Sequence, residues 1–108
     1  MKKSSETILE SANSWIESDQ KVVIATVIKT WGSSPCPIGS KMVINDKGDF
    51  LGSVSGGCVE SNIINECLEL MKNKNSFKKI YFTVQDENAW SIGLACGGKL
   101  IVFIEQIN

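Results

Sequence analysis

The sequence predicts an α+β domain in which one mixed β-sheet packs against two helices, in the order α-β-β-β-α-β-β. Two segments repeat apolar residues at helical spacing, and five shorter segments are rich in β-branched and aromatic residues. The length of 108 residues and the hydrophobic content of 43% fit one core. We therefore expect residues 1–108 to form a single domain.

The first helix is predicted over residues 5–19, where Ile8, Ala12 and Ile16 recur at helical spacing behind serines that can cap its start. Residues 22–30 follow as an almost continuous β-branched run. Such a run is typical of a central strand that is buried on both faces.

A β-hairpin is predicted next. Met42-Val43-Ile44 and the segment 50–54 flank a polar turn in which Gly48 suits a left-handed conformation. The second helix spans residues 59–74. Its apolar stripe includes Cys67, which we interpret as a small core residue.

Two further strands, 80–84 and 100–104, complete the pattern on either side of a polar loop. Their order in the sheet cannot be derived from periodicity. The expected core includes Val23, Ile24, Val27, Ile63, Leu70, Phe82 and Ile101.

Charge and composition argue against several classes of function. The net charge of −1 disfavours a large nucleic-acid surface, and no apolar run approaches a membrane span or a signal peptide. We therefore expect a cytoplasmic protein with reduced thiols. The chain has neither histidine nor arginine, so a bound phosphate must be held by backbone N–H groups, hydroxyls or lysines.

Two cysteines stand beside Gly-Gly pairs, in Ser55-Gly56-Gly57-Cys58 and in Cys96-Gly97-Gly98. In the first, a strand ends and a helix begins, which offers free N–H groups to an anion and lowers the pKa of a thiol. The alternative is a turn that merely needs glycine. The cysteine spacings contain no C-x-x-C pair, which argues against structural zinc.

A third candidate segment is the loop after the first strand. It opens with Trp31-Gly32-Ser33-Ser34 and is stiffened by two prolines that flank Cys36. An aromatic ring, hydroxyls and fixed backbone angles suit a heteroaromatic ligand with polar edges. A plain proline-stiffened connection explains the same residues equally well.

The three segments together resemble the XdhC/CoxI family, whose motifs occur in this order and at similar separation. The matching stretches are Thr30-Trp31-Gly32-Ser33-Ser34-Pro35, Gly52-Ser53-Val54-Ser55-Gly56-Gly57-Cys58-Val59-Glu60 and Gly93-Leu94-Ala95-Cys96-Gly97-Gly98. The resemblance implies an accessory protein that binds the molybdenum cofactor in its molybdopterin form, assists its sulfuration and inserts it into a hydroxylase apoenzyme of the xanthine dehydrogenase type. A cysteine desulfurase is the implied source of sulfur.

By this resemblance the cofactor-binding residues are Trp31, Gly32, Ser33, Ser34, Ser55, Gly56, Gly57, Cys58, Cys96, Gly97 and Gly98. Cys58 and Cys96 would contact molybdenum, and Cys58 is the candidate catalytic thiol. Whether the protein is an enzyme stays open, since a persulfide-carrying sulfurtransferase acting through Cys58 and a ligand-free docking module are alternatives. A homodimer is expected because two-fold dimers are the commonest soluble oligomers.

Two departures from the family pattern are visible. Many members carry a basic residue where this chain has Cys36. Longer members continue into a dinucleotide-binding domain, and no Rossmann fingerprint is present in these 108 residues. We therefore expect a separate Rossmann-domain protein as a further partner.

Overall fold

The computed structural model describes residues 5–32, 37–54, 60–83 and 98–108. The described helices and strands follow the predicted order: α1 (Ser5–Glu17), β1 (Val22–Gly32), β2 (Lys41–Asn45), β3 (Phe50–Gly52), α2 (Glu60–Lys72), β4 (Phe77–Thr83) and β5 (Gly98–Gln106). The α+β class and the element order are thus confirmed.

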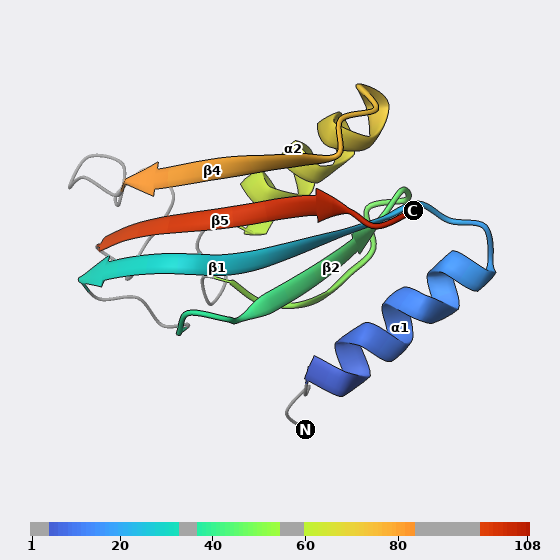
Figure 1. Ribbon diagram of the computed structural model, residues 1–108, viewed down its shortest axis with the longest axis horizontal. Coiled ribbons are helices and arrows are strands. Elements are labelled where there is room, and N and C mark those ends of the chain that lie inside the picture. Colours follow the sequence, from blue (N-terminus) through green and yellow to red (C-terminus); the bar gives the residue numbers. More distant parts are fainter. Residues whose placement is uncertain (1–4, 33–36, 55–59, 84–97) are drawn as a thin grey trace.

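The five strands form one sheet in the order β3-β2-β1-β5-β4, with β1 at its centre (Figure 1). Every neighbouring pair is antiparallel, so the expectation of a mixed sheet was wrong. The physical reason is connectivity. The chain reaches the edge strand β4 first and then turns back to place β5 between β4 and β1. Within the described residues, no helix crossover joins two parallel neighbouring strands.

The two helices cover opposite faces of the sheet, because alternate residues of a strand point to opposite sides. Val22 and Val43 pack with Ile8 and Ala12 of α1. The intervening positions of β1 and β2 pack against α2 instead. Residues 22–27 of β1 are thereby covered from both sides, as a central strand requires.

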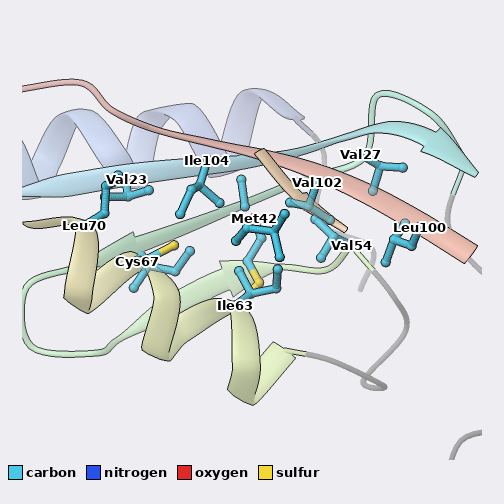
Figure 2. Close-up of a cluster of buried hydrophobic side chains, with 13 residues drawn as sticks. Val23, Val27, Met42, Val54, Ile63, Cys67, Leu70, Leu100, Val102 and Ile104 are labelled. Carbon is cyan, nitrogen blue, oxygen red and sulfur yellow. The ribbon is translucent and has the colours of Figure 1, made fainter. Parts of the chain in front are cut away.

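The larger core cluster lies on the α2 side (Figure 2). Four predicted core residues are buried there: Val23, Val27, Ile63 and Leu70. The other three, Ile24, Phe82 and Ile101, are only partly buried. Ile101 lies on the face of β5 that points away from α2. The helix on that side, α1, packs on β1, β2 and β3, so Ile101 is only partly covered.

Both helices end two residues earlier than predicted. Asp19 and Lys74 adopt left-handed conformations, with φ of 67° and 57°. The next residue in each case donates its N–H back to the helix, Gln20 to the Trp15 carbonyl at 3.0 Å and Asn75 to the Leu70 carbonyl at 3.2 Å. This is the Schellman arrangement, which satisfies terminal carbonyls and stops the helix.

The β2–β3 hairpin has the predicted glycine conformation, with Gly48 at a φ of 85°. Asn45 is fully buried, and its side-chain oxygen accepts hydrogen bonds from the N–H groups of Lys47 and Asp49, each at 2.9 Å. An asparagine that bonds to its own turn in this way fixes the hairpin and hence its register. Neither described helix is long and apolar enough to span a lipid bilayer.

Candidate functional site

The end of β1 and the start of β5 bring two of the three sequence motifs together. Gly32 is the Cα partner of Gly98, and Trp31 is the partner of Lys99. Thr83, the last residue of β4, also pairs with Lys99. We call this edge the Gly32–Gly98 end of the sheet. The motif that contains Trp31 and the motif that contains Cys96 therefore each have a glycine at this end of the sheet.

A bulge lies in β1 between this end and the sheet centre. The pairing register with β5 shifts between Val27 and Lys29. A bulge bends a strand and re-aims the residues that follow it, and such irregularities are frequent beside functional sites. The far side of the β1–β2 loop returns to the same point, since Gly39 donates to the Val27 carbonyl at 2.8 Å and Val27 donates to the Ser40 carbonyl at 2.9 Å.

The connection from β3 to α2 is fastened by a buried carboxylate, that of Glu60. Glu60 is 8% exposed at the start of α2. Its Oε2 accepts hydrogen bonds from Ser53 Oγ and, at 3.1 Å, from the Val54 N–H. Glu60 thus joins the two described ends of the segment that carries Ser55 to Cys58. These hydrogen bonds could have been predicted from the sequence, because Ser53 and Glu60 lie in one motif and can act as the donor and the acceptor that close a short loop.

Val54 anchors the start of this connection in the core. Gly52, where β3 ends, pairs with Met42, and Met42 pairs with Ala25 near the middle of β1. After that, Val54 is fully buried in the α2-side cluster with Leu100 and Val102 near the start of β5 (Figure 2). The chain therefore enters the α2-side core just before the glycine-rich motif.

The described residues include only part of the predicted site. The structure describes the backbone of Trp31, Gly32 and Gly98 and pairs them as above. The remaining predicted binding residues, together with the two candidate metal-contacting thiols, lie outside the described residues: Ser33, Ser34, Ser55, Gly56, Gly57, Cys58, Cys96 and Gly97. Their roles stay predictions.

A positive charge stands directly beside the paired glycines. Lys99 follows Gly98, and its side chain is exposed. Since the chain has no arginine, Lys99 is the cation best placed among the described residues to meet an anionic group at the Gly32–Gly98 end.

Cys67 is excluded from this chemistry. The thiol is fully buried in the α2-side cluster. Burial raises its pKa to about 12, and the nearby Glu66 carboxylate acts in the same direction. A thiol in this state is neither a nucleophile nor a metal ligand at neutral pH, so the prediction of a core cysteine is confirmed.

A shallow cavity of about 550 Å³ is lined by Lys21, Lys74, Gln106 and their neighbours, at the opposite end of the sheet. Its position separates it from the Gly32–Gly98 end. Among the residues that the structure describes, no cluster of three His, Cys, Asp or Glu side chains could hold a metal ion.

Comparison with known proteins gives a family. Residues 15–81 match the model of the XdhC and CoxI family. The molybdenum cofactor insertion chaperone PaoD of Escherichia coli is 31% identical over 102 residues, which cover 94% of this chain. A probable xanthine dehydrogenase subunit from Bacillus subtilis is 30% identical over 93 residues, or 85% of this chain.

A solved structure supports the same relationship. The crystal structure of a xanthine dehydrogenase from Bacillus halodurans superposes with a TM-score of 0.76 at 25% identity, covering 93% of this chain. The chain spans only 31% and 28% of the length of the two curated relatives and 30% of the crystallised chain. The likeness therefore concerns one part of longer proteins.

Proposed function

Because the chain belongs to the XdhC and CoxI family, we propose that it binds the molybdenum cofactor and delivers it to a hydroxylase of the xanthine dehydrogenase type. The observation that carries this proposal is the pairing of Gly32 with Gly98. It sets the described residues Trp31 and Gly32 of one motif beside Gly98 of another, which supports a ligand site shared between the two motifs. PaoD, a molybdenum cofactor insertion chaperone, is similar over nearly all of this chain.

The phosphate of the pterin needs donors that do not rely on arginine. Lys99 supplies a mobile positive charge at the Gly32–Gly98 end. Glycine backbone allows close approach, and Gly56 and Gly57 precede in the sequence the helix α2, whose first N–H groups carry a partial positive charge. We assign the phosphate to this combination and the pterin ring to the neighbourhood of Trp31.

The metal end of the cargo is assigned to Cys58 and Cys96. Thiolates are soft ligands that suit molybdenum and its sulfur ligand. Cys58 precedes α2, whose N-terminal field favours the thiolate, in contrast to buried Cys67. Of the four cysteines, Cys58 and Cys96 are thus assigned to the cargo, and Cys67 serves the core.

The finer parts of the proposal follow from this assignment. The cargo is the molybdopterin form of the cofactor, and its sulfuration draws on a cysteine desulfurase in the cytoplasm. A separate Rossmann-domain protein is proposed as a further partner. The working form is a homodimer.

The direct test is native mass spectrometry after anaerobic incubation with molybdenum cofactor. The proposal expects a mass increase equal to the whole cofactor, with metal. A persulfide on Cys58 after incubation with a desulfurase, without cofactor binding, would indicate a sulfurtransferase instead. Tight binding to the apo-hydroxylase with neither modification would indicate a docking module.

A further inference from the structure

The strand β4 forms one edge of the sheet, with no further strand beyond it among the described residues. Phe77–Thr83 pairs with β5 on one side, and the strand order places β4 last in the sheet, away from α1 (Figure 1). An edge strand of seven residues offers unpaired backbone groups to another strand. The opposite edge is much shorter, because β3 has three residues and ends at Gly52.

Exposed aromatic rings adjoin this edge. Phe77 and Tyr81 are 64% and 67% exposed, and both lie on the face that points away from α2. Phe77 stacks on Phe103 of β5 with ring centroids 5.7 Å apart. Because α1 packs on β1, β2 and β3, this aromatic surface of β4 and β5 stands beside it without a helical cover in the described structure.

The sequence of β4 is complementary to itself when two copies run antiparallel. With Ile80 opposite the partner's Ile80, each Lys79 faces the partner's Tyr81 on the aromatic side. Each Lys78 faces the partner's Phe82 on the α2 side. Lysine beside an aromatic ring is a favourable cross-strand pair. Moreover, Lys78 already pairs with Glu66 at 2.8 Å, which offsets its charge.

Neighbouring registers are poorer. A two-fold axis perpendicular to the sheet keeps equivalent residues on the same face, so the centre moves in whole-residue steps along β4. Centring on Lys79 brings the two Lys79 side chains directly opposite each other, which is destabilising. Centring on Tyr81 leaves Phe77 and Lys78 without partners inside the strand. The register about Ile80 pairs all seven residues.

We propose that a second copy of this chain docks on β4, so that the two sheets join antiparallel about Ile80 into one continuous sheet. The partner is a second copy because the strand fits its own sequence without opposing like charges. This proposal is independent of cofactor binding, since β4 pairs outward here and the Gly32–Gly98 end lies between β1 and β5.

The test compares two charge variants at one exposed position by sedimentation velocity from micromolar to near-millimolar concentration. In the proposed dimer, Tyr81→Lys places a lysine opposite the partner's Lys79, and the two-fold axis creates this like-charge pair twice. Tyr81→Glu places a glutamate opposite the same lysine and creates an opposite-charge pair instead. Both variants lose the ring, so the difference reports the register. We expect Tyr81→Lys to dimerise about tenfold or more weakly than Tyr81→Glu.

The matched control is Phe50→Lys, which adds the same charge to the other edge, at a residue that is 46% exposed. It should dimerise like the parent, and circular dichroism checks that all variants are folded. A parent chain that stays monomeric throughout the concentration range overturns the proposal. So do equal dimerisation of the two Tyr81 variants and a loss of dimer in Phe50→Lys.

Discussion

Gly32 and Gly98 face each other across the β1–β5 ladder, at the last paired position of β1 and the first residue of β5. One belongs to the motif that contains Trp31 and the other to the motif that contains Cys96. Two motifs that are distant in sequence therefore converge at one end of the sheet. We expect the cargo to contact the protein at this end of the sheet.

Lys99 should contribute to cargo binding through its charge. Replacing Lys99 by Ala removes the cation beside Gly98, and we expect about tenfold weaker binding of the phosphate-bearing pterin at low salt, as for a lost charge-assisted hydrogen bond. The difference should shrink as salt is raised. Equilibrium titration followed by Trp fluorescence measures both effects.

The control for this change is Lys47→Ala. Lys47 is exposed in the β2–β3 hairpin, at the other end of the sheet. The Lys47→Ala substitution removes the same charge from the molecule and should leave binding of the pterin unchanged. Equal weakening by the two variants would show that only overall charge matters, and Lys99 would lose its assigned role.

Glu60 should stabilise the domain by holding the β3–α2 connection. Glu60→Ala leaves Ser53 Oγ and the buried Val54 N–H without this acceptor. We expect a loss of about 1–3 kcal/mol in the free energy of unfolding. Urea denaturation measures it, with Glu69→Ala on the exposed side of α2 as the control. A loss no larger than that of the control would contradict the clamp.

The α2-side core makes a second stability prediction. Ile63 is fully buried, so Ile63→Ala should lower the free energy of unfolding by about 2–5 kcal/mol. The same substitution at Ile38, which is 64% exposed, should cost at most about 0.5 kcal/mol. Similar values at the two positions would mean that the apolar stripe of α2 does not face the sheet.

Cys67 should resist modification while Cys58 reacts. Under native conditions an alkylating reagent should label Cys58 well before Cys67, because burial raises the pKa of the Cys67 thiol to about 12. Peptide mass spectrometry after a short exposure separates the two positions. Faster labelling of Cys67 would refute the assignment.

The same shift predicts a dependence of stability on pH. The Cys67 thiol ionises near 9.0 in the unfolded chain and near 12 in the folded one. Because the thiol ionises more readily when unfolded, the free energy of unfolding falls as the pH rises from 9.0 towards 12. Cys67→Ala should flatten this fall over the same interval. An unchanged slope would contradict the shift.

Local pattern was sufficient for the elements of this fold. Helical periodicity located α1 and α2, and Gly48 marked the hairpin. The ends of the helices were placed too late because Asp19 and Lys74 take left-handed conformations that neither residue type requires. The antiparallel arrangement depends on which strands become neighbours, a property of the whole chain.

The burial of an apolar strand residue depends on whether a helix covers the face on which that residue lies, and the sequence does not show this. Val23 and Val27 face α2, whereas Ile101 is equally apolar and faces away from it. For the site, composition identified the motifs but gave no reason for two of them to meet. The Gly32–Gly98 pairing joins residues far apart in the sequence, so only the assembled fold creates it, whereas the bonds of Glu60 close a short loop within one motif.

The most direct test of cofactor binding compares Cys96→Ser and Gly57→Val with the parent and with Ser14→Val, an exposed change on α1. The measurement is molybdenum cofactor retained after anaerobic gel filtration, with circular dichroism to confirm folding. We predict that Cys96→Ser weakens retention of the metal-containing cofactor but keeps the metal-free pterin, because a soft ligand is lost while the shape remains. Gly57→Val should lose both, since a side chain blocks close backbone approach, and Ser14→Val should match the parent. Retention of cofactor at the parent's level by both folded site variants would contradict binding at the Gly32–Gly98 end.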